Sequence, residues 1–303
     1  MTARTARTAR TARTNTTSTA VELDELLAAA RELSLAGRWE RALRLLDSAS
    51  CATPGDRARL ALAAAEVALQ SDWFGGTALT APRAEHAEKQ APGTDGGSGT
   101  GRDPNFDWDL GFVRLRHDYL RLLRGDGTFR PGPEGKDPEA LTGLRRRALA
   151  LREDGPDQVR RGWASMYLGL IADNLFAERT AAPAHYDAAL SAGETGGDDL
   201  LAREALRHLG DHDHDDGDHG RALARWERAT ALGARAGMVP GVLTQQLLLA
   251  VLARDAGDEA GATALAREIA RWAGALGMGS VHAQATGFLA GTDPTAAPQE
   301  SGS

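Results

Sequence analysis

The feature that most constrains the fold of this chain is a repeated spacing. The hexapeptide GDHGRA at 217–222 and the hexapeptide GDEAGA at 257–262 lie forty residues apart, and leucine- and alanine-rich segments flank both. Each hexapeptide is typical of a short turn between two helices, because glycine commonly follows the end of a helix. A forty-residue period with two helices per unit indicates a helical repeat, since one hairpin cannot bury its apolar face alone.

Composition favours helices over strands throughout the chain. Only eight valines and two isoleucines occur in 303 residues, whereas alanine and leucine dominate. Sheets draw on β-branched residues, and alanine and leucine are among the best helix formers. All twelve prolines lie between segments with helical periodicity, as helix interiors require. We therefore expect an all-α fold of five to six antiparallel hairpins, depending on whether the second and weakest hairpin is genuine.

Apolar periodicity predicts thirteen helical segments, the last of which would cap the stack. They are expected at about 21–36, 39–53, 56–71, 82–91, 107–124, 138–153, 157–176, 183–193, 198–216, 219–234, 240–256, 259–274 and 280–290. In this interpretation the residues around Pro54 close the second segment, and Trp73 to Gly76 connect the third to the fourth.

One folded domain is expected at 21–291, between two disordered tails. The N-terminal tail, 1–20, repeats Thr-Ala-Arg four times and has almost nothing to bury, and the C-terminal tail is expected at 292–303. Glycine, proline and small polar residues predict a flexible insert at 92–105 and an irregular insert at 125–137.

The segment that follows residue 205 resembles the tetratricopeptide repeat (TPR) family. That pattern has Leu-Gly on the first helix of a hairpin, and an alanine with an aromatic residue four positions later on the second. Leu209-Gly210, Ala222 and Trp226 match it, whereas Asp213 stands where the family usually has tyrosine. Small residues suit positions where two helices approach closely, and Trp226 would fill the space between neighbouring hairpins.

Three other segments fit the same repeat pattern. Residues 56–154 are assigned to the repeat only by analogy. The matching residues are Ala29-Ala30, Leu33, Ala42 and Leu46 in the first hairpin, Leu168-Gly169, Ala182 and Tyr186 in the fourth, and Leu249-Ala250, Ala262 and Ala266 in the last.

The resemblance implies a right-handed α-solenoid whose first helices line a concave groove that binds peptides or helices of other proteins. On the helix predicted at 198–216, polar residues occupy the face opposite the apolar stripe, and related positions follow on the neighbouring repeats. Arginine and asparagine can hold a peptide backbone or carboxylate through paired hydrogen bonds. A solvated charged surface is the alternative. The candidates for a partner-binding groove are Asn174, Arg203, Arg207, Asp211, His214 and Arg254.

Asp213 and the tryptophans have structural interpretations. The helical angle of Asp213 places it on the apolar face, and a buried carboxylate needs a partner. The candidates are an arginine such as Arg221 or Arg225, or the backbone amides near Gly217, and a functional acid is the alternative. The tryptophans at 163, 226 and 272 are expected to fill the core, because aromatic residues at helical spacing usually pack.

A metal site is the alternative interpretation of the His- and Asp-rich stretch at 208–219. His208, Asp211, His212 and Asp215 share one helical stripe at i, i+3, i+4 and i+7, a spacing that suits zinc. No His-Glu-x-x-His motif accompanies them, and acids near a glycine-terminated helix end are typical of solvated surface. We therefore predict neither a metal nor another cofactor.

Several classes of function are disfavoured by what the chain lacks. A net charge of -7 argues against nucleic acid as a partner, and no run of apolar residues is long enough for a membrane span. Cys51 is the only cysteine, which fits a reducing compartment, and no nucleophile elbow or phosphate-binding loop is present. No catalytic residue can be named.

Together these features predict a non-catalytic protein-interaction module in the bacterial cytoplasm, with another protein or a peptide as its partner. One alternative is a sensor of a small molecule or signal peptide. A second is a metal-dependent enzyme that uses the stripe at 208–219. An open groove would favour the protein-interaction module. An enclosed apolar pocket would favour the sensor, and bound metal would favour the enzyme.

Overall fold

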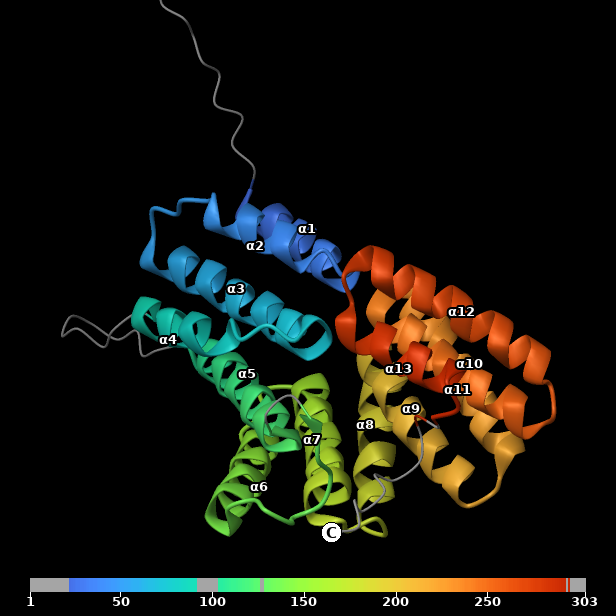
Figure 1. Cartoon of the computed structure of the whole chain (residues 1–303). Helices are drawn as coiled ribbons and strands as arrows, with labels where there is room; N and C mark the ends of the chain where they lie inside the picture. The colour runs from blue at the N-terminus through green and yellow to red at the C-terminus, as the bar shows by residue number, and fades with distance from the viewer. Residues whose placement is uncertain (1–21, 92–102, 126–127, 293, 295–303) are drawn as a thin grey trace, which may run out of the picture.

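The computed structural model describes residues 22–91, 103–125, 128–292 and 294, and this part of the chain is almost entirely helical (Figure 1). The helices are α1 (Leu23–Leu35), α2 (Trp39–Asp47), α3 (Pro54–Gly75), α4 (Thr80–Gln90), α5 (Pro104–Leu123), α6 (Pro138–Glu153), α7 (Gln158–Phe176), α8 (Ala182–Gly196), α9 (Asp199–Asp215), α10 (His219–Arg235), α11 (Val239–Asp255), α12 (Glu259–Leu276) and α13 (Gly279–Leu289). The strands β1 (Arg124–Gly125) and β2 (Thr128–Phe129) form a short antiparallel pair within the insert expected to be irregular.

The all-α prediction is confirmed for these residues, and each predicted helical segment has a counterpart. Several boundaries were wrong: α2 ends at Asp47 rather than near 53, residues 73–75 belong to α3 rather than to a connection, and prolines begin α3 and α5. Thr53 accepts a hydrogen bond from the backbone N–H of Asp56, so Pro54 opens α3, which then runs through Gly75. Asp103 caps α5 in the same way, so this helix begins inside the insert predicted at 92–105. Proline suits the first turn, where its missing N–H has no helical partner. The predicted tails lie largely outside the described residues, as does most of that insert.

A twenty-residue period underlies the forty-residue repeat. At the end of α9, Gly217 has φ +79°, and the N–H of Asp218 donates to the carbonyl of Asp213 at 2.8 Å. At the end of α10, twenty residues later, Gly237 has φ +73° and Met238 makes the equivalent bond to Gly233 at 2.9 Å. At the end of α11, Gly257 has φ +86° and Asp258 makes it to Ala253 at 2.8 Å. This geometry closes a helix in the left-handed region that glycine tolerates best. Each hairpin of forty residues is therefore two helices of similar length.

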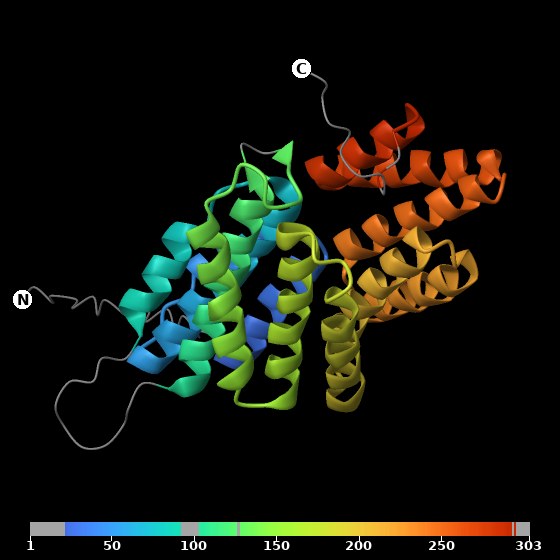
Figure 2. The same cartoon turned by 90° about the horizontal axis from the view of Figure 1, so that it is seen from below.

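Consecutive helices pack against each other, and odd-numbered helices also contact one another. Among the described helices, α3 contacts α1 and α5, and α7 contacts α5 and α9. Figure 2 shows α7 and α8 side by side, the contact typical of one hairpin. The odd-numbered helices contact one another in the successive pairs from α1 to α9, as α11 does with α13, and we refer to them as the inner layer and to the even-numbered helices as the outer helices. None of the described helices combines the length and apolar character that a bilayer crossing requires.

Small residues face aromatic rings where the two helices of a hairpin meet. A Cβ atom built at Gly210 of α9 would overlap the indole of Trp226 on α10, and one built at Gly169 of α7 would overlap the ring of Tyr186 on α8. Trp226 and Tyr186 are wholly buried, as expected. In the next hairpin, Ala250 and Ala266 occupy the corresponding positions, and both are also fully buried.

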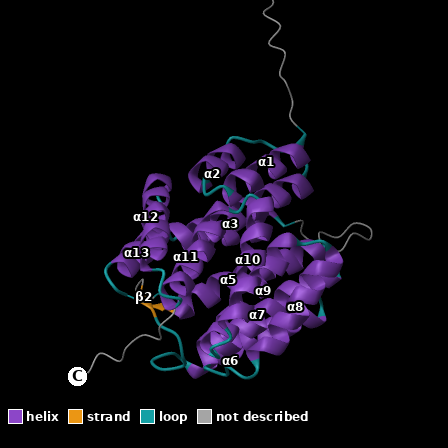
Figure 3. Ribbon diagram, turned by 90° about the vertical axis from the view of Figure 1, so that its right-hand side faces the viewer, coloured by secondary structure: helices purple, strands orange, loops and turns teal. Residues whose placement is uncertain are grey.

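The first and last hairpins share one hydrophobic cluster, an arrangement that the sequence did not indicate. Trp39 and Leu46 of α2 belong to the same cluster as Ile269 of α12 and Phe288 of α13. The Met278 methyl group packs directly against Gly37, and α13 contacts α3. Figure 1 shows α1 and α2 (blue) beside α12 and α13 (red), and Figure 3 shows β2 near α13. The helices therefore curl until the two ends of the described chain meet.

Candidate functional site

The polar residues of α9 face the inner layer while its apolar residues hold the helix in place. Asp198 caps α9 by accepting a hydrogen bond from the backbone N–H of Leu201 at 2.9 Å. Leu201, Leu206 and Leu209 are buried. Since residues three and four apart share a face of a helix, this burial aligns the polar residues on the opposite face.

We define the inner polar cluster as Arg203, Glu204, Arg207, His208 and Asp211 of α9 with Gln245 of α11. Arg207 Nη1 lies 3.0 Å from His208 Nε2 and Arg207 Nη2 lies 3.9 Å from Asp211 Oδ2. The His208 ring lies between two carboxylates, with Nε2 3.5 Å from Glu204 Oε1 and Nδ1 3.4 Å from Asp211 Oδ2. Arg203 donates to Glu204, and its Nη2 donates to the carbonyl of Gly241 at 3.0 Å.

Charge within the cluster shifts two ionisation equilibria. Burial alone would raise the pKa of Glu204, but Arg203, His208 and Arg207 hold this pKa well below its usual range. Burial opposes the charge of Arg207, but Asp211 and Glu204 raise its pKa above the ordinary value. Glu204 and Arg207 are therefore ionised at neutral pH.

Side chains of α5 and α7 extend the polar surface across the inner layer. The Asn174 amide donates to the Tyr119 hydroxyl at 2.9 Å, and Arg116 Nε donates to the Tyr167 hydroxyl at 3.2 Å. Burial raises the pKa of Tyr119, so this hydroxyl stays protonated. The charge of Arg207 acts in the opposite direction on the pKa of this hydroxyl, to which Asn174 donates.

Asp173 connects this surface to the rest of α9. Its Oδ2 lies 2.9 Å from His212 Nε2 and accepts from the Tyr186 hydroxyl at 3.2 Å. Burial raises the pKa of Asp173, but the contact with His212 outweighs it and the net shift is downward. The ring of Tyr186 stacks on His208 with centroids 5.3 Å apart.

The polar surface reaches α3 through Glu66. The Glu66 side chain is exposed to solvent, but the protein around it partly desolvates the carboxylate. This desolvation, together with the negative charge of Asp109, raises the pKa of Glu66. Arg116 and Arg160 act in the opposite direction. Arg160 is held by Asp109 through two 2.7 Å hydrogen bonds and keeps α7 against α5.

Several buried polar atoms at the inner polar cluster have no partner among the described residues. Gln245 is completely buried, and neither its amide oxygen nor its amide nitrogen makes a hydrogen bond. The Nε atoms of Arg203 and Arg207 and the Oδ1 atom of Asp211 are also unpaired. Unpaired buried polar groups are costly, and they suggest water or ligand partners.

The structure brings some of the predicted groove residues together and places others elsewhere. Arg207 and Asp211 are part-exposed in the cluster, near Asn174, whereas Arg203 is only 3% exposed and lies between α9 and α11. His214 points instead to Asp255, with its Nε2 3.0 Å from Asp255 Oδ2. Arg254 packs over the ring of Phe288 at 3.6 Å and pairs with Glu259 at 2.9 Å.

The predicted metal stripe on α9 does not form one site. His208 faces Asp211, His212 pairs with Asp173, and Asp215 lies 3.7 Å from Arg179. The regular helical spacing is present, but His208 has its partner on α9 itself, His212 on α7 and Asp215 in the turn after α7.

Tyr119, Tyr167, Arg116 and Gln245 were not among the sequence candidates. Arg116 and Tyr119 lie on α5, and Tyr167 of α7 contacts this helix. The sequence of α5 has no direct match to the repeat pattern. For Gln245 a signal existed, because Ala205 occupies the position forty residues earlier and is also completely buried.

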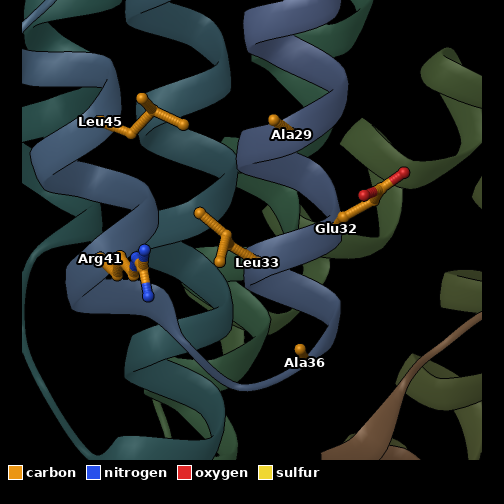
Figure 4. A pocket seen from close by; sticks show the side chains of 6 residues that line it. All are labelled: Ala29, Glu32, Leu33, Ala36, Arg41 and Leu45. Atoms are coloured by element: carbon orange, nitrogen blue, oxygen red, sulfur yellow. The ribbon is translucent and has the colours of Figure 1, made fainter.

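Pronounced recesses in the described surface lie away from the inner polar cluster. One is an open depression between α1 and α2, lined by Ala29, Glu32, Leu33, Ala36, Arg41 and Leu45 (Figure 4). Another, on α6, is lined by Pro138, Glu139, Thr142, Gly143 and Arg146. Neither shares a residue with the polar surface of α5, α7 and α9.

The structural interpretation of Asp213 is confirmed, and that of Trp272 is not. Asp213 is buried and binds both predicted arginines, with Oδ1 2.9 Å from Arg221 Nε and Oδ2 2.7 Å from Arg225 Nη1. Trp272 is 46% exposed and donates to Glu268, because it lies at the edge of the buried face of α12. Trp163 is partly buried and packs against the core.

Replacing Asp213 with asparagine should lower the free energy of unfolding by about 2 kcal/mol, a typical loss for charged hydrogen bonds. The cost stays below that of a fully buried pair because Arg221 is largely exposed and can be solvated. Urea denaturation followed by circular dichroism measures the change. Asp187→Asn, at an exposed position of α8, is the control and should unfold at the wild-type midpoint. Equal midpoints for the two variants would exclude a stabilising role for Asp213.

Neither protein-family models nor curated proteins give a match to this chain.

Proposed function

We propose that this chain is a TPR-like helical-repeat protein whose inner layer binds an extended peptide segment of another protein, without catalysis. Its fold supports the proposal in two ways. Odd-numbered helices contact one another in succession from α1 to α9, and the small residue at the hairpin crossing recurs as Gly169, Gly210 and Ala250 about forty residues apart. The family resemblance implies that the first helix of each hairpin faces inward.

The observation that carries the proposal is the convergence of partly paired polar side chains from three helices. Asn174 of α7 binds the Tyr119 hydroxyl of α5, and Arg207 of α9, which lies 3.9 Å from Asp211, acts electrostatically on the same hydroxyl. An extended peptide presents a donor and an acceptor at each residue, so a surface with amide, guanidinium, carboxylate and hydroxyl groups can bind its backbone. Arg207 is the strongest donor of the set and keeps an unpaired Nε.

The chemistry of the surface favours an extended peptide over a partner helix. A helix keeps its backbone donors and acceptors paired internally, whereas an extended peptide offers them to the amide, guanidinium, carboxylate and hydroxyl groups. A small-molecule sensor is the second candidate. An enclosed apolar pocket would favour it, whereas the recesses described above are open and lie elsewhere. The single cysteine, Cys51, fits a reducing compartment, and we place the protein in the cytoplasm.

Selection of peptides from a random display library on the full chain, followed by calorimetry on the enriched peptides, tests the proposal. Arg207→Ala should weaken binding by about 1–3 kcal/mol, the range for a lost charge-assisted hydrogen bond. Asn174→Ala should weaken it as well. Arg235→Ala, at an exposed site on the outer helix α10, is the matched control and should bind as wild type.

Two outcomes would count against peptide binding at this surface. Peptides that bind wild type and Arg207→Ala equally would place the site elsewhere. A tightly bound small molecule, found by native mass spectrometry and lost in Arg207→Ala, would favour the sensor. Thermal melts of each variant separate lost binding from lost folding.

A further inference from the structure

Two histidines and an aspartate meet where three helices end or begin, outside the inner polar cluster. His214 lies in the last turn of α9, His219 is the first residue of α10, and Asp255 is the last residue of α11. One ligand atom from each residue lies within 4.8 Å of the other two. Within the described ranges, this is the one group of three potential metal ligands with such spacing.

Surrounding contacts position two of the three side chains in advance. His214 Nε2 lies 3.0 Å from Asp255 Oδ2, and the His214 ring stacks on the buried indole of Trp226 with centroids 5.5 Å apart. His219 stacks on the other histidine with centroids 5.1 Å apart and is itself exposed. Trp226 therefore fixes the first ligand, while His219 has the freedom to turn towards a third position.

The distances fit a tetrahedral ion more closely than a large cation. Zinc binds imidazole nitrogen and carboxylate oxygen at about 2.0–2.2 Å, so neighbouring tetrahedral ligands lie roughly 3.3 Å apart. His214 and Asp255 are already near that separation, and a modest rotation of the exposed His219 brings the third ligand in. Calcium and magnesium prefer sites built from oxygen ligands, and two imidazoles argue against them.

We propose that His214, His219 and Asp255 bind one divalent transition-metal ion of the zinc type, with solvent completing its coordination. The ion joins α9, α10 and α11, and so links two successive hairpins at the ends of their helices. Asp215, Asp216 and Asp218 adjoin the site in sequence, and their negative charge adds to its attraction for a cation. The site does not depend on the peptide-binding proposal, because it uses none of the residues on which that proposal rests.

Calorimetric titration of the full chain with zinc chloride, after removal of metals with a chelator, tests the site. We expect one zinc ion per chain. His219→Ala and Asp255→Asn should each lower the affinity by more than about 100-fold, which exceeds the usual effect of losing an outer partner of a ligand. His282→Ala, an exposed histidine on α13, and Asp187→Asn, an exposed acid on α8, are the controls and should leave the affinity unchanged.

A second measurement reports on the link between hairpins. Zinc should slow amide hydrogen exchange at the turns around residues 216–218 and 256–258 in the wild type, and not in His219→Ala. Unchanged affinity in His219→Ala, or an equal loss in His282→Ala, overturns the proposal. Loss of binding in His208→Ala but not in His219→Ala also overturns it, since the ion would then lie on the α9 stripe. Since His219 is exposed, its alanine variant should melt like the metal-free wild type.

Discussion

Replacing Gly210 with leucine should lower the free energy of unfolding by about 3 kcal/mol, at the upper end of the usual effect of overpacking. The cause is direct, because even a Cβ atom at this position would overlap the indole of Trp226. Trp226 has no exposed surface and donates to the carbonyl of Arg207 at 3.0 Å, so it cannot move aside freely. Urea denaturation of the full chain measures the change.

The glycine of α6 provides the matched control for this variant. A Cβ atom at Gly143 would meet nothing within 4 Å, and alanine there should be neutral or stabilise by about 0.5–1 kcal/mol through the better helix propensity. Gly169→Leu should behave like Gly210→Leu, because Tyr186 lies against Gly169 in the preceding hairpin. A Gly210→Leu protein with the wild-type urea midpoint would show that the two helices do not meet at this position.

A double variant distinguishes the specific overlap from a general loss of helix stability. Trp226→Ala alone should cost about 3–5 kcal/mol because it leaves a cavity. The leucine of Gly210→Leu can enter that cavity, so the two changes together should destabilise by less than the sum of the single effects. Additive effects would contradict the contact.

The positions that sequence reasoning identified correctly are those that the local repeat determines. Gly210 and Trp226 follow from the forty-residue register, and the partners of Asp213 follow from its helical angle and the nearby arginines. Gln245 was missed although the same register predicts its burial. In each case the relevant neighbours belong to the same hairpin or the next one, and a one-dimensional repeat describes such contacts well.

The polar surface of α5, α7 and α9 was only partly predictable because it joins helices that are distant in sequence. Tyr119 and Asn174 are 55 residues apart, and α5 lacks the repeat pattern that would have aligned them. His214 was expected in the groove with Arg207, but its position near the end of α9 brings it to Asp255. Side-chain direction at a helix end depends on the neighbouring helix as much as on periodicity.

The contact between the chain ends could not be inferred at all from the repeat. The path of a stack of hairpins depends on small rotations between successive units, and these add up along the chain. A change of a few degrees at each interface would separate Met278 from Gly37. The shared cluster of the first and last hairpins is therefore a property of the whole structure, and its consequences can be measured.

Replacing Phe288 with alanine should lower the free energy of unfolding by about 3–5 kcal/mol, the usual range for a buried phenylalanine. Phe288 is 1% exposed, and Arg254 lies over its ring and donates to its carbonyl at 3.2 Å. Phe129→Ala makes the same chemical change at a side chain that is 50% exposed, and should have little effect.

The regions that Phe288→Ala destabilises are a sharper test of chain closure than the total loss of unfolding free energy. Phe288 shares a hydrophobic cluster with Trp39 and Leu46, which lie more than 200 positions earlier in the chain. In an open stack, each hairpin is stabilised mainly by its neighbours, so only the last units would loosen. With the ends in contact, Phe288→Ala should also speed amide hydrogen exchange in α1 and α2, since local opening follows the contacts that hold each element. Faster exchange confined to α11–α13 would show that the two ends do not support each other.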